Sequence, residues 1–146
     1  MSLSEVPAYP GDLILHMESE GYCCEKATIR NGTGASVVLE NYVGLPLKAG
    51  TNGADYNIAK ATEEANVIAL LVKGPCGHAP ETLANNTTSS KQYLVLARAP
   101  AIINKDAIPD NDLAGAAYTK ATIVTALKAL KFVVKSEPTD EESMSY

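Results

Sequence analysis

The 146-residue sequence has no tryptophan and only one phenylalanine, so valine, isoleucine, leucine, alanine and tyrosine must build its core. Basic residues are also few, because 12 Lys and Arg stand against 17 Asp and Glu, for a formal net charge of −5. Nucleic-acid-binding proteins concentrate Lys and Arg, so we expect no nucleic-acid partner. No apolar run approaches the roughly 20 residues of a membrane helix, and the N-terminus does not have the pattern of a signal peptide. We therefore expect no membrane partner.

Cysteines are limited to Cys23, Cys24 and Cys76. An odd number, with two of them adjacent, is not a disulfide framework. A metal site would recruit one of the adjacent cysteines together with Cys76, His78 and His16. The C-x-x-C and H-x-x-x-H spacings typical of such sites are absent from the sequence. We predict reduced structural thiols, no metal site and no cofactor.

Catalytic and nucleotide-binding motifs are missing as well. The patterns G-x-S-x-G, G-x-G-x-x-G and G-x-x-x-x-G-K-[ST] do not occur. The two histidines have no positioned partner, and the pair Glu63-Glu64 lies in a polar context typical of solvated surface. We predict that the protein is not an enzyme and favour an interaction protein. An enzyme would need a metal.

Short apolar runs separated by turn signals predict a mainly β domain with one α-helix. The strongest buried strand is expected at 67–72 (VIALLV), a continuous apolar run stopped by Gly74-Pro75. Asn31-Gly32 is a turn signal, and residues 48–51 read as another turn. Residues 76–90 read as a long polar loop. Further strands are expected at 21–29, 37–39, 42–45, 56–59, 93–97, 101–103 and 132–134. Strands of this length and spacing are typical of a small β-barrel or sandwich-like core.

The single helix is expected between residues 110 and 131. Asp110, Asn111 and Asp112 are its candidate N-caps, since their side chains accept hydrogen bonds from the first backbone N–H groups. One broad face contains the apolar residues Ala116, Ile123, Val124, Leu127 and Leu130. We expect this face to pack on the sheet of the same chain.

The predicted domain organisation has three parts: an N-terminal arm at 1–20, a β-rich domain with a C-terminal helix at 21–135, and an acidic flexible tail at 136–146. Pro7, Pro10 and Gly11 break any helix in the arm, and only the triplet Leu13-Ile14-Leu15 is strongly apolar. An isolated triplet of this kind is not expected to bury itself alone. Two interpretations stay open: a disordered terminus, or a segment that becomes ordered on a partner by strand addition.

The segment 91–134 reads KQYLVLARAPAIINKDAIP, then a polar gap, then KATIVTALKALKFVV. This order of two strands, a Pro-containing turn, one Leu/Ala-rich helix and a closing apolar strand resembles the C-terminal half of the lambda-type bacteriophage head decoration proteins. Residues 20–29 are similar to the family's entry into the domain, and residues 43–50 and 67–71 to two further segments. The chain departs from the family pattern at Cys24-Glu25, where Ser-Arg is usual, and at Lys131, where a glycine often ends the helix.

The resemblance implies a small β-barrel or tulip-like domain with an extended N-terminal arm. Such proteins bind the outer surface of the phage head as homotrimers at threefold positions, where they stabilise the expanded capsid. The implied partners are the major capsid protein and further copies of the chain. The implied location is the outer surface of the virion, after synthesis in the host cytoplasm.

The predicted capsid-binding residues are Leu13, Ile14, Leu15 and Tyr22. The apolar triplet is expected to anchor the arm by backbone strand pairing and side-chain burial. The alternative function is a tail-associated or non-viral β-rich adhesion module. Such a module would bind sugar or protein through the Asn/Thr-rich loop.

Overall fold

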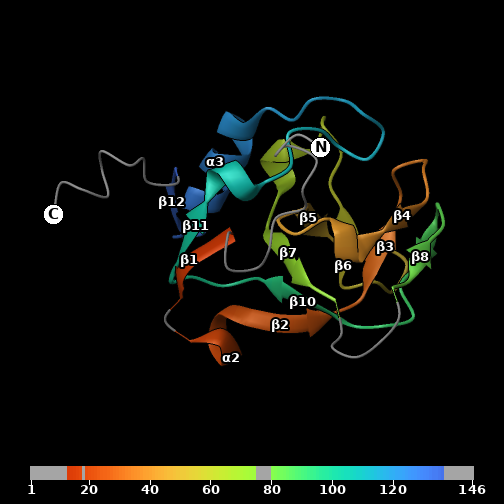
Figure 1. Cartoon of the computed structure of the whole chain (residues 1–146), viewed down its shortest axis with the longest axis horizontal. Helices are drawn as coiled ribbons and strands as arrows, with labels where there is room; N and C mark the ends of the chain where they lie inside the picture. Colours follow the sequence, from red (N-terminus) through yellow and green to blue (C-terminus); the bar gives the residue numbers. More distant parts are fainter. Residues whose placement is uncertain (1–12, 18, 75–79, 137–146) are drawn as a thin grey trace, which may run out of the picture.

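A computed structural model describes residues 13–17, 19–74 and 80–136 of the chain (Figure 1). Within these residues the strands form a seven-stranded sheet, a three-stranded sheet and a two-stranded ribbon. One helix, α3 (Lys120–Ala129), has several turns, and α2 (Glu20–Cys23) is a single turn. The protein is therefore mainly β with one α-helix, as predicted. No helix in the described part of the chain is long and apolar enough to cross a membrane.

The seven-stranded sheet has the order β2-β10-β7-β5-β6-β3-β9. Its neighbours pair antiparallel except β3 and β6, which are parallel. β2 and β3, far apart in this order, are separated along the chain by Thr28 alone, so the sheet curls back towards itself. The described strands do not form a closed sheet. Their bounds are β2 (Cys24–Ala27), β3 (Ile29–Asn31), β5 (Pro46–Ala49), β6 (Tyr56–Ile58), β7 (Ala69–Lys73), β9 (Thr87–Thr88) and β10 (Tyr93–Leu96).

The three-stranded sheet lies at the other side of the molecule, next to α3 (Figure 1). It places β11 (Ala101–Asn104) between β1 (Ile14–Met17), which runs antiparallel to it, and β12 (Val133–Lys135), which runs parallel. Parallel neighbours need a crossover connection, and the segment that contains α3 supplies it. The remaining strands, β4 (Val37–Val38) and β8 (Thr82–Leu83), pair with each other. Short 3-10 turns occupy Leu39–Asn41, Glu64–Asn66 and Lys105–Ala107.

The core consists of two apolar clusters on the two sides of β7. Successive side chains of a strand point to opposite faces, so Leu70 and Val72 enter one cluster while Ala69 and Leu71 enter the other. The first cluster includes Ile123 and Leu127 of α3, so this part of the predicted apolar face packs on the sheet of the same chain, whereas Leu130 is exposed. Burial on both faces explains why this strand reads as a continuous apolar run.

The structure changes the expected position of the N-terminal triplet. β1 pairs with β11, with Ile14 opposite Ile103, and Leu13 is fully buried in the first cluster. For Leu13 and Ile14, neither a disordered terminus nor a segment ordered only on a partner describes the structure, because β11 of the same chain supplies the backbone partner and the apolar surroundings. Residues 1–12 of the predicted arm and 137–146 of the predicted tail lie outside the described residues.

The helix also begins later than expected. Its N-cap is Thr119, so Asp110, Asn111 and Asp112 are not the caps, and Ala116 lies before the helix and is exposed. The C-terminal end is a Schellman motif, in which the N–H groups of Lys131 and Phe132 donate to the carbonyl groups of Lys128 (2.9 Å) and Leu127 (3.2 Å). Lys131 has a φ of +76°, the left-handed conformation in which glycine is usual. The chain makes the sharp turn into β12 with lysine in that position.

Two loop predictions need correction. The segment expected as a strand at 42–45 is a turn that follows the 3-10 turn at Leu39–Asn41. It contains Gly44, which has a φ of +86°, and a Cβ there would lie 2.8 Å from the carbonyl oxygen of Ala107. The strand begins instead at Pro46 and includes Lys48 and Ala49, which had been assigned to a turn. The polar segment 80–90 is not all loop, because β8 and β9 lie within it.

Candidate functional site

The four predicted capsid-binding residues differ in how much of their surface is available. Leu13 is completely buried and Ile14 is half-buried, so neither is presented to a partner as a whole side chain. Leu15 is 41% exposed and Tyr22 is 59% exposed. The other large apolar side chains found exposed in the described residues are Ile68, Leu130 and Val133.

Tyr22 is held in place by Arg98, which reaches it from the turn after β10. The guanidinium carbon of Arg98 lies 5.9 Å from the centre of the Tyr22 ring, within cation–π range. Its Nη1 atom donates to the Tyr22 carbonyl oxygen at 3.2 Å, and its Nη2 atom lies 3.4 Å from Glu25 Oε2. Tyr22 is therefore an exposed aromatic ring with a restricted orientation.

The sheet beside Leu15 has a free edge within the described residues. β1 is the edge strand of the three-stranded sheet and pairs only with β11 there. Strand register aligns His16 with Ile102 and Ile102 with Val133, so these three side chains share the outer face. His16 and Val133 are exposed and Ile102 is half-buried. An unpaired strand edge beside exposed apolar side chains is a template for pairing with another chain.

The adjacent cysteines are both buried and serve packing. Cys23 ends α2 and Cys24 begins β2. The sulfur of Cys23 lies 3.3 Å from the carbonyl oxygen of Pro100, and that of Cys24 lies 3.5 Å from the sulfur of Met17. The first contact joins α2 to the turn before β11, and the second joins β2 to β1. Cys76 and His78 lie outside the described residues, and the described part of the chain holds no group of three or more His, Cys, Asp and Glu side chains suited to a metal ion.

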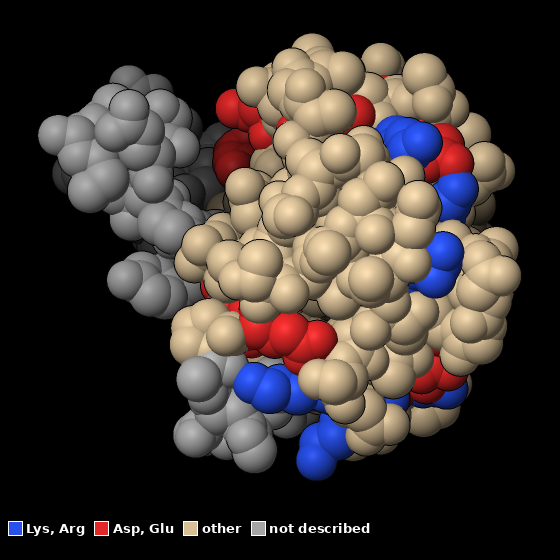
Figure 2. Space-filling view, turned by 90° about the vertical axis from the view of Figure 1, so that its right-hand side faces the viewer, with Lys and Arg blue, Asp and Glu red and all other residues tan. Residues whose placement is uncertain are grey.

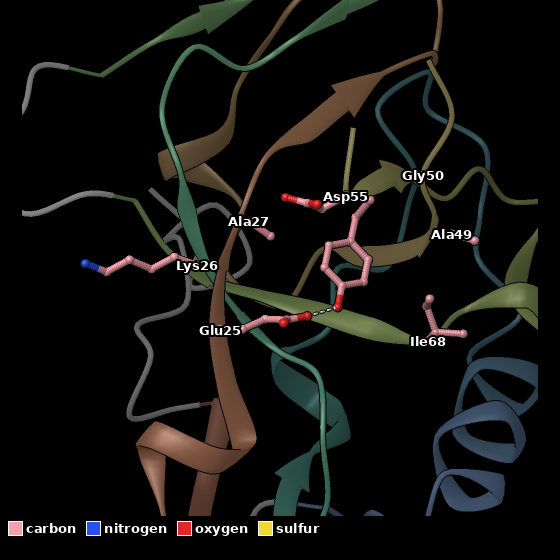
Figure 3. A pocket seen from close by; sticks show the side chains of 8 residues that line it. Glu25, Lys26, Ala27, Ala49, Gly50, Asp55 and Ile68 are labelled. Atoms are coloured by element: carbon pink, nitrogen blue, oxygen red, sulfur yellow. Dashed lines mark hydrogen bonds between the residues drawn. The ribbon is translucent and has the colours of Figure 1, made fainter. Parts of the chain in front are cut away.

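A cavity of about 310 Å³ lies where β2 and β6 face each other without backbone pairing (Figure 3). The Tyr56 hydroxyl donates to Glu25 across this gap. Figure 3 marks a hydrogen bond to the Glu25 carboxylate with a dashed line, and it shows Lys26 pointing away. Asp55 accepts from the backbone N–H (2.9 Å) and the hydroxyl (3.2 Å) of Thr28. Side chains therefore bridge the place where the sheet does not close.

The ionisable side chains of this cavity serve to stabilise the fold. Burial, followed by the hydrogen bond and the negative charge of Glu25, raises the pKa of Tyr56 far above its ordinary value. The phenol therefore stays protonated and acts as a hydrogen-bond donor. The oxygens of Glu25 are shared between Tyr56 and Arg98, and one oxygen of Asp55 takes both donors of Thr28. We assign the cavity no acid–base role.

The end of the molecule that carries β4 and β8 has a different character. Segments 31–38 and 82–90 contain no charged residue and are rich in Asn, Thr, Ser and Gly. In the view of Figure 2, which faces the right-hand side of Figure 1, a broad central area is free of charge and charged side chains lie around it. This end of the molecule, defined by segments 31–38 and 82–90, is called the uncharged end below.

Asn31 organises the uncharged end from within. Its side chain is fully buried and donates to the carbonyl oxygens of Ala35 (2.6 Å) and Leu83 (3.0 Å). Its Oδ1 atom accepts from both the N–H and the hydroxyl of Thr33, at 3.0 and 2.7 Å. The Asn31-Gly32 pattern indicates only a turn, so sequence reasoning missed this role. One buried amide thus fixes two loops against each other.

Comparisons with family models, with curated proteins and with solved structures give no significant match to this chain.

Proposed function

We propose that this protein is a structural virion protein that binds the outer surface of a phage head as homotrimers at threefold positions and stabilises the expanded capsid. The residue order of segment 91–134 supports the proposal. In the structure the closing strand β12 pairs with β11, and α3 lies between these two strands in the chain. The finer fold that goes with this function is a small barrel of the tulip-like type. In such a barrel β2 and β3, which Thr28 alone separates, would form a single interrupted strand.

The observation that carries the proposal is the edge strand β1 with its exposed Leu15. Within the described residues β1 is an edge strand of the three-stranded sheet, and such an edge can accept a strand of the major capsid protein. Leu13 is buried and anchors β1 to the core. Leu15 and Tyr22 are therefore the side chains available to contact the capsid protein, while Ile14 is half-buried within the strand. The attachment surface is therefore a preformed edge of the folded domain.

The strength of one such contact is small. Fully burying a leucine side chain contributes about 1.5–3 kcal/mol, and Leu15 has 41% of its surface left to bury. One copy of this residue thus contributes on the order of 1 kcal/mol. Three linked copies convert weak single contacts into firm attachment through their high effective concentration. This is the physical reason to expect trimers on the shell.

Co-sedimentation with intact heads of the particle that carries the protein tests the attachment. Leu15→Gln should reduce occupancy strongly, and Tyr22→Ala should do the same to a smaller extent. Leu130→Gln is the matched control, since Leu130 has the same side chain and is 38% exposed at the end of α3. Full occupancy by the Leu15 variant would show that the β1 edge is not the attachment surface. Images of decorated heads without threefold clustering would refute the proposal as a whole.

A second candidate function rests on the uncharged end. It presents amide and hydroxyl groups on loops that Asn31 and the bond from Gly34 N–H to Asn85 Oδ1 (2.8 Å) hold in place. Preorganised polar loops suit an adhesion module that binds sugar or protein. Saturable binding on a glycan array, without co-sedimentation with heads, would favour this candidate over capsid decoration.

A further inference from the structure

A second cavity, of about 250 Å³, opens on the outer face of the seven-stranded sheet. Its floor is a row of three side chains from three neighbouring strands: Arg30 pairs with Asn57, and Asn57 pairs with Lys48. Residues paired across adjacent strands point to the same face. All three are half-buried, while Ile29 and Ile58, on the opposite face, belong to the core. Strand register alone therefore brings a guanidinium, an amide and an ammonium group side by side.

The rim of the cavity is polar and partly fixed. The Asn57 side chain accepts from the Thr51 N–H at 3.2 Å and donates to the Thr51 hydroxyl at 2.8 Å, which leaves one of its amide hydrogens for a ligand. Asn52 and Asn86 add two further side-chain amides from turns on either side. Both have φ angles in the left-handed region, at 54° and 60°, where asparagine is one of the few residues that fit readily. The rim thus offers several hydrogen-bonding groups at short range.

The charge of the cavity is opposite to that of the chain. Arg30, Lys48 and Lys60 face one acidic residue, Glu63, so the lining carries three positive charges and one negative charge, a balance of +2, in a chain of net charge −5. Glu63 is already engaged, because one oxygen binds Lys48 and the other accepts the Lys60 backbone N–H at 2.9 Å. Within the described residues, neither Arg30 nor the Lys60 ammonium group has an acidic partner in ion-pair contact.

Glu63 stays ionised at neutral pH and therefore does not add a proton donor to the cavity. Burial raises the pKa of its carboxyl group, but the hydrogen bonds from Lys48 and from the Lys60 backbone outweigh this effect and leave the pKa below its ordinary value. An incoming anion thus meets Arg30 and Lys60, because Lys48 is neutralised by Glu63. Arginine binds carboxylate and phosphate groups through two parallel N–H donors.

We propose that this cavity binds one acidic sugar unit, with its carboxylate or phosphate group on Arg30 and Lys60 and its hydroxyl groups on Asn52, Asn57 and Asn86. The cavity is smaller than the clefts that take drug-sized ligands, which suits a single sugar ring. It has no aromatic side chain in its lining, so a neutral sugar would have neither a stacking surface nor a charge partner. The site is built from β3, β5 and β6 and shares no residue with the β1 edge.

The affinity should be modest and sensitive to salt. The cavity is open to solvent and its two available charges lie near the surface, where ions screen them. We expect millimolar binding to a monomeric ligand that weakens as sodium chloride is added. A polymer with repeated acidic sugars would bind more tightly, because several copies of the site would act together.

Titration of the ¹⁵N-labelled full chain, followed by amide chemical shifts, tests the proposal. The probes are glucuronate, glucose 6-phosphate, glucose and inorganic phosphate. Saturable shifts at residues 30, 51–52, 57, 60 and 86 are expected with the two acidic sugars and not with glucose. The double variant Arg30→Gln/Lys60→Gln should weaken binding at least tenfold. Arg98→Gln/Lys128→Gln removes the same two charge types from elsewhere and should leave the affinity within twofold.

Each other outcome overturns the proposal in a defined way. Binding of inorganic phosphate as tightly as the acidic sugars would show a site for anions alone, without sugar recognition. Equal shifts with glucose would show that the charges are not used. Failure of every probe to saturate, or binding unchanged in the Arg30/Lys60 variant with its spectrum otherwise intact, would remove the site. None of these results bears on head attachment, which uses β1.

Discussion

Asp112 holds the segment that leads into α3, and we predict that Asp112→Asn destabilises the protein by about 2–4 kcal/mol. Its carboxylate is buried and accepts the backbone N–H groups of Ala61 and Ala114, each at 3.0 Å, and of Ala116 at 2.8 Å. Asparagine has one acceptor oxygen where aspartate has two, so an NH₂ group must face at least one of these N–H groups. An unsatisfied buried donor costs about 1–3 kcal/mol, and the remaining bonds lose their charge assistance.

The effect should depend on pH in a defined direction. Burial raises the pKa of Asp112, but the backbone N–H groups of Ala61, Ala116 and Ala114 outweigh it, so the folded-state pKa lies below the ordinary value. A carboxyl group of this kind adds stability that is present above its unfolded-state pKa of about 3.9 and is lost as pH falls through the folded-state pKa. The gap between wild type and Asp112→Asn should therefore be full at neutral pH and shrink in acid.

Urea denaturation of both proteins at neutral pH and in acid measures this gap. Asp110→Asn is the control, because it removes the same charge two residues away. The Asp110 side chain is 82% exposed and makes an ion pair with Lys120 at 2.8 Å, which contributes about 0–1 kcal/mol in such a position. Equal costs for the two variants, or a gap that does not change with pH, would refute the role assigned to the Asp112 carboxylate.

Three further predictions concern the helix end, the first strand and the thiols. Lys131→Gly should stabilise the protein by about 1 kcal/mol in thermal or urea unfolding, since glycine adopts positive φ without strain, whereas Lys128→Gly within α3 should destabilise it by a similar amount. Leu13→Ala should cost about 2–5 kcal/mol and Leu15→Ala less than about 1 kcal/mol, because only the first side chain is in the core; equal costs would place β1 outside the folded domain. Cys23→Ser should keep the fold at a cost of about 1–2 kcal/mol, and loss of folding together with loss of bound zinc would show that the thiol is a ligand.

Local sequence patterns were sufficient where one segment carries its own burial signal. The run 67–72 predicted β7 because a strand buried on both faces needs no polar alternation. Ile123 and Leu127 identified the buried face of α3, because helical spacing places them on one stripe. In both cases the pattern of apolar residues within one segment already specifies which side chains face the core.

The same patterns failed where a distant segment decides the outcome. Asp112 looks like a helix cap from its neighbours, but its second oxygen is taken by Ala61, which lies 51 residues away. The burial of Leu13 cannot be predicted from its neighbours in sequence, because β11, which pairs with the adjacent strand β1 and contributes Ile103 to the same cluster, is remote in sequence. The cavity proposed to bind an acidic sugar has no sequence motif, since Arg30 and Lys48 become neighbours of Asn57 only through the parallel pairing of β3 with β6 and the antiparallel pairing of β5 with β6.

The position of β11 between β1 and β12 also orders the events of folding. Ile14 pairs with Ile103, 89 positions later, and β12 pairs on the other side of the same strand. During synthesis β1 therefore has no strand partner until the chain has been made as far as β11, at Ala101–Asn104. Closing so long a loop has a high entropic cost and slows folding. We expect the three-stranded sheet to assemble last, so that a nascent chain already contains the β5–β6 pairing before its first strand has a place to dock.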